Sequence, residues 1–558
     1  MIEDVYEPLA AYSGEFKDKL SRLAREKFLS LADSSGVDRD ANRHLVSVIK
    51  SLEKSASSAR TKKNASFFFM VLGFITAAVS IFAAASSQKA DSGTVGFWLL
   101  GFAAGLALGS WLFPVHRRAK ARLKDLEADI AAKRSEAWRQ MAPLNRLYTW
   151  DIPVKLIEAT VPRLAFDPYF TDSRLLCLKE GYGWDDSFND GKSIIFAQSG
   201  EINGNPFVFG EYLEMQWGEK TYEGTKDISW TEWETDSNGK RRRVTRHQTL
   251  RATVVKPIPE YSDEKILVYG NEAAPDLSFS REPSGLNADD SAFFGNIRKH
   301  WRLSRLKAFS RNLSDSSDFT LMNNHEFETW FHAKDRDDEV QFRLLFTPVA
   351  QRQMLMLMKD RSVGFGDDFA FAKVRRINIL ASRHLNDGVL DTDPARFRHW
   401  DFDAAFGNFT AFNERYFKDV YFSLAPLLAI PLYQQTRPGG AMAPELHGGS
   451  SFWEHEAIAN FHGEEAFRHP DSVTRNILKT RVESRDGGAC DISVTAHGFR
   501  GEKRTDTEEV LGGDGKWHAV AIPWIEYLPV ERVRLMHIEE NPAPADARAR
   551  RSILSSLD

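Results

Sequence analysis

Three side chains that could form a hydrolytic zinc site lie close together in the C-terminal third of the chain. His455 and Glu456 match the first two positions of the His-Glu-x-x-His zinc-protease helix, but the fifth position is Ala459 instead of histidine. His462 follows His455 by seven residues, two helical turns and about 10 Å along the axis, which is too far to share one ion. We therefore expect no metal, and keep His455, Glu456 and His462 as catalytic candidates only for an alternative function.

Two further patterns resemble ligand sites and fail on spacing. Gly191-Lys192-Ser193 has the ending of a phosphate-binding P-loop, but the glycine that should begin the loop is replaced by Asp186, which would repel a phosphate. The acidic run from Asp335 to Glu339 lacks the glycine and the ligand spacing of a calcium-binding EF-hand, so it predicts a turn. The sequence has neither a G-x-S-x-G nucleophile elbow nor a G-x-G-x-x-G dinucleotide fingerprint. We expect no cofactor, and a binding protein is favoured over an enzyme.

The composition is that of a globular protein without a strong charge preference. The 73 basic and 78 acidic residues give a formal net charge of -5, so the overall charge does not favour a nucleic-acid partner. The two cysteines, Cys177 and Cys490, are too few for a disulfide scaffold and indicate a reducing compartment. At 558 residues, the chain is long enough for two or more soluble units beside a membrane part.

Two uncharged runs near the start of the chain have the length of membrane-spanning helices. As helices, Ala65 to Ala85 and Val95 to Phe113 would span about 31 Å and about 28 Å, close to the thickness of a bilayer's hydrocarbon core. The segment between them contains Lys89 and Asp91, and each charge costs roughly 2.5 to 3.5 kcal/mol at the centre of a membrane helix. The first run starts too late for a cleaved signal peptide. The sequence therefore predicts a transmembrane hairpin at 65–113, with helices at 65–85 and 95–113.

Basic residues flank this hairpin on the side of the chain ends. Three of them precede the first run: Arg60, Lys62 and Lys63. Five follow the second run: Arg117, Arg118, Lys120, Arg122 and Lys124. The positive-inside rule then places both termini in the cytoplasm. The five residues are also candidates for contacts with anionic lipid headgroups, at roughly 1 kcal/mol per charge, although topology alone accounts for them.

A stripe of small residues marks one face of the second apolar run. Gly101, Gly105 and Gly109 recur every four residues, a spacing that lets two helices approach closely in lipid. The first run offers small residues from Gly73 to Ala84 as counterparts. Packing within the hairpin and an oligomerisation face are both compatible with this stripe, so a homo-oligomer stays open.

The remaining chain separates into regions by periodicity. Helical spacing of apolar residues predicts a cytosolic helical segment at 1–64 and a cytosolic stalk helix at 114–149. From residue 150, short strands with turn signals alternate irregularly with helices, which predicts a cytosolic α+β domain at 150–436 with antiparallel sheet. A Gly- and Pro-rich stretch then precedes an expected C-terminal α+β domain at 452–540, and the composition of 541–558 indicates a flexible tail.

The clearest pair of strands in the sequence has its turn at Asn238-Gly239, which favours a two-residue hairpin loop. This register places Asp236 opposite Arg241 and Glu234 opposite Arg243, so opposite charges meet across the strands. We therefore expect the basic run beside the turn to be largely neutralised within its own hairpin. A contact with phosphate or lipid headgroups at the tip is the alternative.

Several segments resemble a known bacterial family. The resemblance is carried by EFETWF (Glu326 to Phe331), LLFTP (Leu344 to Pro348), YFTDSRLL (Tyr169 to Leu176) and GEINGNPFVFGE (Gly200 to Glu211). The chain resembles, from the hairpin to about residue 420, a membrane-protein family known only as a domain of unknown function, number three-one-three-seven. The resemblance implies an N-terminal membrane hairpin followed by a cytosolic mixed domain at the bacterial inner membrane, and it implies no activity.

The preferred hypothesis is a membrane-anchored cytosolic binding or scaffold module without a known activity. Its expected partners are the lipid bilayer and either another protein or a second copy of the chain, with no nucleic acid. The alternative is a membrane-tethered, metal-dependent hydrolase that uses His455, Glu456 and His462. An enzyme of this kind would bring those three side chains together in a pocket.

Overall fold

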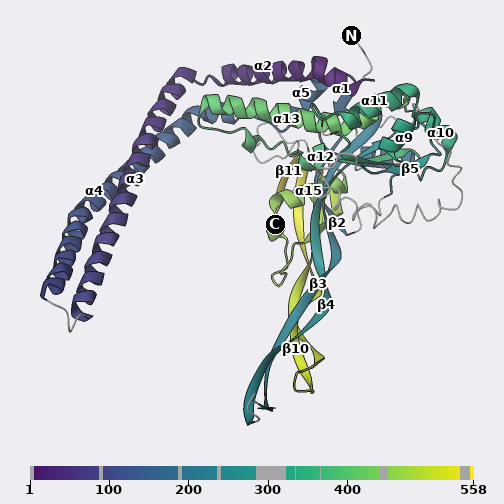
Figure 1. The fold of residues 1–558 in the computed structure, drawn as a ribbon. Helices are drawn as coiled ribbons and strands as arrows, with labels where there is room; N and C mark the ends of the chain where they lie inside the picture. The colour runs from purple at the N-terminus through teal and green to yellow at the C-terminus, as the bar shows by residue number, and fades with distance from the viewer. Residues whose placement is uncertain are drawn as a thin grey trace. The chain divides into compact units, whose positions relative to one another are not determined.

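The computed structural model describes residues 6–86, 92–185, 191–235, 240–284, 322–333, 335–364, 366–438, 449–540 and 553–557. They form helices and antiparallel sheets, as the predicted α+β class requires, with two long apolar helices near the start of the chain (Figure 1). The chain divides into two compact units. One comprises Met1–Arg22, Thr149–Asp393 and Asn413–Asp558, and the other comprises Leu23–Tyr148 and Pro394–Phe412.

The helical unit is built on two very long helices that pack along each other. These are α3 (Arg39–Ser86) and α4 (Ser92–Asn145). Each helix is continuous from its polar part into its apolar part. In the polar parts, buried apolar residues such as Ile49 and Ile130 recur at helical spacing, so that each helix buries one face against the other. The unit also contains most of α2 (Lys17–Ser35) and the first part of α13 (Phe402–Leu428).

The apolar ends of α3 and α4 are long and hydrophobic enough to cross a membrane. Only 22% and 17% of the most apolar stretches of α3 and α4 is buried. A core helix of a soluble protein would hide such a surface from water. The exposed side chains therefore favour lipid as their surroundings.

The second unit contains a seven-stranded antiparallel sheet in the order β1-β2-β3-β4-β7-β6-β5. Its strands are β1 (Leu164–Phe166), β2 (Lys192–Ile202), β3 (Asn205–Thr235), β4 (Arg241–Gly270), β5 (Ser278–Arg281), β6 (Phe369–Val374) and β7 (Ile377–Ser382). Buried side chains of β2, β3 and β4 form one core with Trp453 of α15 (Phe452–His462). This core holds the base of β3 and β4 rigidly.

The other helices that lie wholly within this unit are short. They are α1 (Pro8–Ala11), α5 (Ile152–Thr160), α6 (Asp172–Leu176), α9 (His325–Phe331), α10 (Glu339–Leu345), α11 (Pro348–Lys359), α12 (Arg383–Asp387) and α14 (Pro431–Gln435). Single turns of π or 3-10 helix occur at η1 (Tyr12–Phe16), η2 (Cys177–Gly181), η4 (Pro394–Arg396) and η5 (Glu464–Ala466).

A second, four-stranded antiparallel sheet has the order β11-β10-β9-β8. Its strands are β8 (Ile477–Asp486), β9 (Ala489–Leu511), β10 (Trp517–Glu540) and β11 (Ile553–Leu557). Strand β11 lies within the expected flexible tail at 541–558, where Ile553–Leu557 pairs with β10 and Leu557 packs against the core of this sheet. Residues 541–552 lie outside the described part of the chain.

The segment 452–540, where a C-terminal α+β domain is expected, contains α15 and the strands β8, β9 and β10. It belongs to the same compact unit as Thr149–Asp393. The physical reason is Trp453, which is 1% exposed and lies against β3 so closely that a Cβ at Gly210 would stand 2.8 Å from its ring. A side chain of this size shared between two segments makes them one hydrophobic core.

Two pairs of strands continue beyond the sheets as two-stranded ribbons. β3 pairs with β2 only as far as Glu214, and from Met215 to Thr235 it pairs with β4 alone, over roughly 70 Å. The ribbon of β9 and β10 packs against it through a cluster that includes Ile228 and Ile522. We call the two ribbons together, 215–235 with 241–261 and 499–511 with 517–529, the β-arm (Figure 1).

Candidate functional site

The first sequence candidate, His455, lies inside the protein core. Its side chain is 1% exposed, and its Nε2 lies 2.8 Å from Ser450 Oγ, which in turn lies 2.7 Å from Glu540 Oε1. Burial, and secondarily the positive charge of Arg485, lowers the pKa of His455 to about 3, so its ring is neutral at physiological pH. With a carboxylate as the final acceptor, Nε2–H donates to Ser450 and Ser450 donates to Glu540. The serine proton is thus already held, and Ser450 is itself buried away from any substrate.

The second candidate, Glu456, joins three elements of the core. Its Oε1 lies 2.8 Å from Lys479 Nζ of β8, and its Oε2 accepts a hydrogen bond of 2.9 Å from Ile194 N of β2. A general base needs a carboxylate oxygen directed at a substrate or water. Both oxygens of Glu456 are instead used to hold α15 against the two sheets, which is a structural role.

The third candidate, His462, has a partner of its own. It is the last residue of α15, it is half-buried, and its Nε2 lies 2.8 Å from Ser555 Oγ of β11. Gly463, with a φ of +92°, ends the helix only after both histidines. The structure therefore does not bring His455, Glu456 and His462 together. Within the described ranges, no group of three or more His, Cys, Asp or Glu side chains is arranged to hold a metal ion.

The segment that resembles a P-loop ending starts a strand instead of a helix. Lys192, in β2, is buried with its Nζ 4.5 Å from the centre of the Tyr212 ring and 3.8 Å from Glu214 Oε1. A P-loop requires a helix whose N-terminal amides bind the phosphate. Gly191-Lys192-Ser193 instead leads into strand β2, and Lys192 is already paired with Glu214, so this segment does not form a phosphate site.

The acidic run completes the hydrogen bonding of an edge strand. Asp335 Oδ1 accepts from Ser280 N at 2.8 Å, and Asp337 Oδ1 accepts from Ser278 N at 2.6 Å. Both serines belong to β5, the last strand of the seven-stranded sheet, whose outer N–H groups would otherwise lack partners. Asp338 caps α10 by accepting from Gln341 N at 2.8 Å. Each of these three carboxylates accepts a hydrogen bond from a backbone N–H group, so their arrangement is explained without a calcium ion.

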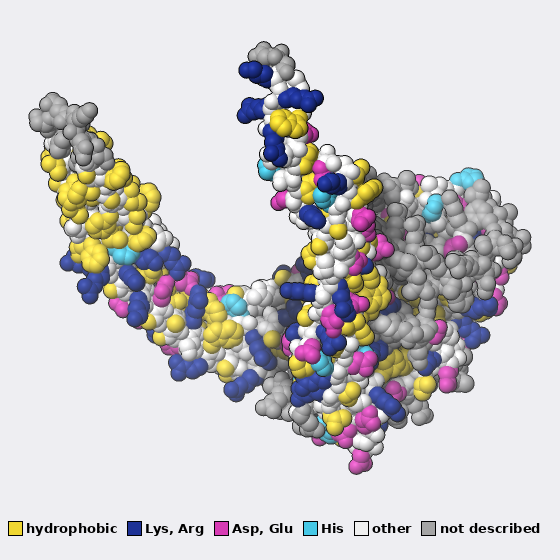
Figure 2. All heavy atoms as spheres, turned by 90° about the horizontal axis from the view of Figure 1, so that it is seen from below, with side chains coloured by type: hydrophobic (Ala, Val, Ile, Leu, Met, Phe, Trp, Pro, Cys, Tyr) yellow, Lys and Arg dark blue, Asp and Glu magenta, His cyan; other side chains and the backbone are white. Residues whose placement is uncertain are grey.

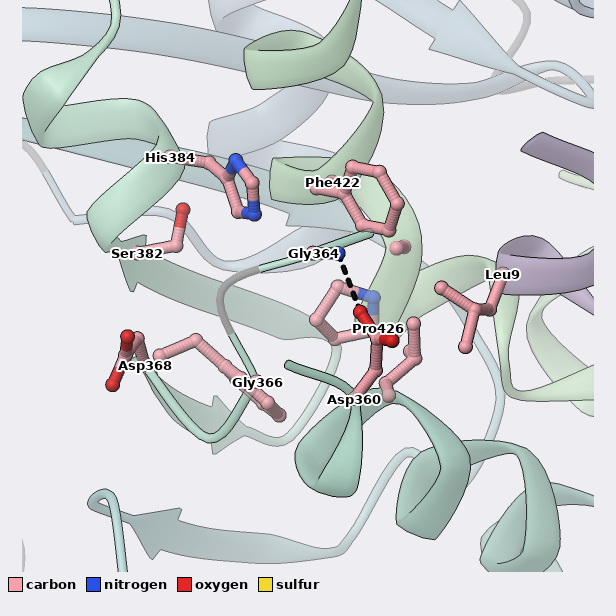
Figure 3. Close-up of a pocket in the computed structure, with 12 residues that line it drawn as sticks. Leu9, Asp360, Gly364, Gly366, Asp368, Ser382, His384, Phe422 and Pro426 are labelled. Carbon is pink, nitrogen blue, oxygen red and sulfur yellow. Dashed lines mark hydrogen bonds between the residues drawn. The ribbon is translucent and has the colours of Figure 1, made fainter. Parts of the chain in front are cut away.

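One small pocket brings together residues that the sequence analysis did not connect. Figure 3 shows that His384 of α12, Asp360 after the end of α11, and the neighbouring Phe422 and Pro426 of α13 line this pocket. The His384 ring stacks on Phe422, and burial lowers its pKa below the ordinary histidine value. The pocket holds about 20 Å³, which suffices for a single water molecule and not for a substrate.

The predicted glycine stripe lies at the contact between α3 and α4. A Cβ at Gly105 would stand 2.6 Å from Gly73 O, and a Cβ at Gly101 would stand 2.7 Å from Ser80 Oγ. A Cβ at Gly109 would stand 2.9 Å from the Phe74 ring. The three glycines therefore allow close packing within the hairpin, one of the two roles that their spacing left open.

The opposite faces of the hairpin carry large exposed hydrophobic side chains. They include Phe68, Ile75, Phe82, Phe97, Leu100 and Trp111. Figure 2 shows hydrophobic side chains gathered near the end of the hairpin, followed by a group of Lys and Arg side chains. The five predicted headgroup ligands on α4 are all exposed: Arg117, Arg118, Lys120, Arg122 and Lys124. An apolar belt next to exposed basic side chains is the surface expected at a bilayer boundary.

The register of β3 and β4 at the end of the β-arm differs by one residue from the expected one. The turn residues predict Glu234 opposite Arg243, but Glu234 lies opposite Arg242, and Trp233 lies opposite Arg243. Successive residues of a strand point to opposite faces, so this shift moves Arg243 from the face of the glutamate to the face of the tryptophan. The other expected partner, Asp236, and the turn lie outside the described residues.

The ion pairs nearest the end of this hairpin, those of Arg246, lie on the face that turns toward the second ribbon. Arg246 Nε lies 2.6 Å from Glu232 Oε1, and Arg246 Nη2 lies 3.4 Å from Glu234 Oε1. These even-numbered residues share their face with Ile228 and Leu250, which pack against β9 and β10. The acidic residues are therefore neutralised by Arg246, which was not among the expected pairs.

The opposite face at the end of the hairpin has no such neutralisation. Arg241 and Arg243 are exposed and form no ion pair with any residue in the described ranges, and Trp233 beside them is 67% exposed. Figure 2 shows Lys and Arg side chains around this end of the arm. We call Trp233, Thr235, Arg241 and Arg243 the outer tip face.

Comparison of the chain with protein-family models, with curated proteins and with solved structures finds no match in any of the three. The resemblance to the family of unknown function therefore stays a prediction. Any function assigned to the chain must rest on the geometry of its described residues.

Proposed function

We propose that the protein is a two-pass membrane-anchored binding or scaffold module, with the β-arm as its binding element. In this proposal α3 and α4 cross a bacterial inner membrane and both termini lie in the cytoplasm. The observation that carries it is the presence, in one chain, of a helical hairpin with an apolar outer surface and a long β-arm whose end is left exposed.

The anchoring part of the proposal is supported by how the hairpin distributes its side chains. Its glycines are used in helix-helix contact, whereas most of its large aromatic and aliphatic side chains remain exposed. Burying one such side chain stabilises by about 1.5 to 3 kcal/mol, so lipid would be strongly preferred to water. The basic flank from Arg117 to Lys124 then favours the cytoplasmic side.

The binding part is supported by the contrast between the core and the arm. Polar residues that could act in catalysis, such as His455 and Glu456, are buried and engaged in structural contacts. The end of the β-arm instead exposes tryptophan and arginine, the residue types most often responsible for binding energy at interfaces. Trp517, at the end of the second ribbon, is likewise 65% exposed.

Topology and anchoring can be tested on the full chain in native membranes. We expect the chain to stay in the membrane pellet after an alkaline carbonate wash. A cysteine placed at Ala90 should react with a membrane-impermeant maleimide in intact cells, whereas a cysteine at Thr245 should react only after lysis. The unsubstituted chain controls for Cys177 and Cys490, of which Cys490 is buried. Release by carbonate would contradict the anchor, and labelling of Thr245→Cys in intact cells would contradict the cytoplasmic arm.

The role of the β-arm can be tested by shortening both ribbons. Joining Thr221 to Val255, and Arg504 to Trp524, each through Asn-Gly, removes the distal arm at residues that are paired across the strands. We expect this variant to insert into membranes normally and to lose the protein or lipid that co-purifies stoichiometrically with the full chain after gentle solubilisation. An unchanged set of bound components, or a tightly held metal whose loss results from His455→Ala, would overturn the proposal.

A further inference from the structure

On the outer tip face, Arg241 and Arg243 form no ion pair with the acidic residues that the structure describes. From Ser229 to Thr235 and from Arg241 to His247, the outward, odd-numbered residues include no Asp or Glu. Their side chains are Trp, Arg, His, Ser and Thr, all of which can donate hydrogen bonds. The nearest outward acid, Asp227, accepts a hydrogen bond of 2.6 Å from Thr249 Oγ1. The face is therefore suited to an anionic partner rich in acceptor oxygens.

The residues of the outer tip face do not pack against the second ribbon. The second ribbon ends at Leu511 and Trp517, whose turn contacts the first ribbon near Trp230 and Gln248. Beyond that point the first ribbon continues as a two-stranded hairpin without support. Such a hairpin is only marginally stable in water, so its exposed tryptophan and arginines would gain order from a partner.

Prolines in two of the four strands of the arm make β4 and β10 poor edges for pairing with a further strand. Pro257 and Pro259 lie in β4, and Pro523 and Pro529 lie in β10. Prolines spaced by an even number of residues point the same way, and a proline cannot donate to a further strand. The outer tip face, which carries the exposed tryptophan and arginines, is therefore considered as the docking surface.

We propose that the outer tip face docks on anionic phospholipid headgroups. This inference rests on the proposed function, because the membrane hairpin of the same chain would keep a bilayer at high local concentration beside the arm. Arg241 and Arg243 bind the headgroup phosphates, and Trp233 enters the interfacial layer, where an amphipathic ring is most stable. The membrane hairpin holds the chain in the bilayer, and the tip adds a second, reversible contact that depends on lipid charge.

An anionic lipid surface fits this face better than an acidic protein does. Cytoplasmic leaflets carry anionic lipids and attract basic residues close to the surface with about a fivefold gain per charge. A hot spot in a protein interface is surrounded by contacts that exclude water. Trp233 is 67% exposed, and its flanking outward residues are small hydroxyl side chains and arginines instead of an apolar rim. An acidic protein partner is kept as an outcome of the test.

The test uses the full chain inserted into vesicles of phosphatidylcholine, alone or mixed with phosphatidylglycerol. An environment-sensitive fluorophore is attached at Thr245→Cys, on the outer face two residues from Arg243, and in a parallel sample at Val244→Cys on the inner face. We expect a blue shift and quenching by brominated lipid only for the Thr245 label and only in anionic vesicles. Added salt should reverse both signals.

Two arginine variants provide a matched comparison, because they remove the same charge from adjacent positions on opposite faces. Arg243→Gln should lower the docked fraction about fivefold, whereas Arg242→Gln should leave it nearly unchanged. Equal losses in both variants would overturn docking by the outer face. Equal signals in neutral and anionic vesicles, or no signal in either, would overturn lipid recognition.

Further outcomes separate this inference from the proposed function. A chain that inserts stably but shows no signal at the tip refutes tip docking and leaves the anchor standing. A chain that fails to insert refutes the proposed function and the docking that depends on it. A signal produced by soluble polyglutamate but not by anionic vesicles would assign the face to an acidic protein instead.

Discussion

The base and the tip of the β-arm are parts of the same two strands, yet they have opposite environments. At the base, Phe207, Phe209 and Leu267 are almost completely buried between a sheet partner on each side and core residues on the faces. At the tip, Trp233 of β3 and Arg243 of β4 are exposed, and among the described residues the two strands pair only with each other there. The difference shows that the two strands continue well beyond the core that packs against their base, and that packing determines which part of them stays exposed.

The same comparison separates the catalytic candidates from the tip. Glu456 and Arg243 are both ionisable residues singled out by the sequence, but Glu456 is 1% exposed with each oxygen engaged and Arg243 is exposed without an ion pair in the described ranges. A buried charge must be paired to be tolerated, so its partners are part of folding. An exposed, unpaired charge costs folding nothing and remains available to a partner.

The largest expected effect is at the base of the arm. Phe209→Ala should lower the free energy of unfolding by about 3 to 5 kcal/mol, because it removes a fully buried ring and leaves a cavity. Chemical denaturation of the solubilised chain, followed by fluorescence and circular dichroism, measures this change. Thr231→Ala, in the same strand but at the exposed end, serves as the control and should change stability little. A small effect at Phe209 would mean that the base is loosely packed and does not differ from the tip.

A second prediction concerns the pH dependence that His455 gives to the core. Burial holds its pKa at about 3 in the folded state, below the ordinary value near 6.5. Between pH 3 and pH 6.5, His455 is therefore protonated in the unfolded chain but neutral in the folded one. The free energy of unfolding consequently falls as the pH decreases from about 6.5 to 3. The slope from this one group approaches 1.4 kcal/mol per pH unit.

Denaturation midpoints measured between pH 4 and pH 7 in the wild type and in His455→Gln test this linkage. In His455→Gln, the free energy of unfolding should fall less steeply as the pH decreases, even if the variant is less stable than the wild type at neutral pH. His462→Gln is the comparison variant: burial also lowers the pKa of His462, but this side chain is only half-buried, so we expect a smaller change in the slope. Equal slopes in all three proteins would show that His455 is accessible to protons in the folded state.

Much of the fold could be predicted from the sequence because it depends on local patterns. The two apolar runs, the helical flanks and the start of α11 at Thr347-Pro348 follow from periodicity and capping chemistry, and Thr347 does accept a hydrogen bond from Ala350 N at 3.4 Å. The register at the tip could not be predicted from its turn residues. A loop longer by one residue changes the face of every side chain, and local propensity scarcely distinguishes the two lengths.

The candidate site illustrates the same limit. The mismatch of His455 and His462 to a zinc helix is visible in their spacing, but the burial of Glu456 depends on Lys479 and Ile194, which are distant in the sequence. The strand formed by Ile553–Leu557 has no clear sequence signal, because a short apolar segment becomes a strand only when an edge such as that of β10 is available. The burial of Glu456 and the pairing of Ile553–Leu557 both depend on contacts between segments that are distant in the sequence. Such contacts cannot be read from a single sequence.

A smaller effect is expected where the two ribbons of the arm touch. A Cβ at Gly224 would collide with the backbone carbonyl of Ala521, whereas a Cβ at Gly218 would meet only the flexible end of the Glu260 side chain. Gly224→Ala should therefore destabilise the distal arm by about 1 to 3 kcal/mol through overpacking, and Gly218→Ala should have little effect. Hydrogen exchange of the peptides around Ile228 and Ile522 measures the local opening. Faster exchange in both variants would show that the contact of the ribbons is not set by Gly224.

The smallest effect on stability, and the sharpest test of the comparison, is expected at Trp233. Its ring is 67% exposed and packs against no hydrophobic cluster in the described residues, so Trp233→Ala should change the free energy of unfolding by less than about 0.5 kcal/mol. Trp230→Ala, three residues earlier but on the face that packs against β9 and β10, provides the matched control and should loosen the arm measurably. Docking on anionic vesicles should show the reverse order, with Trp233→Ala weakening it and Trp230→Ala affecting it only through the arm's stability. If Trp233→Ala destabilised the arm as much as Trp230→Ala, the tip would be a packed part of the fold, and its exposed tryptophan and arginines would no longer distinguish it from the base.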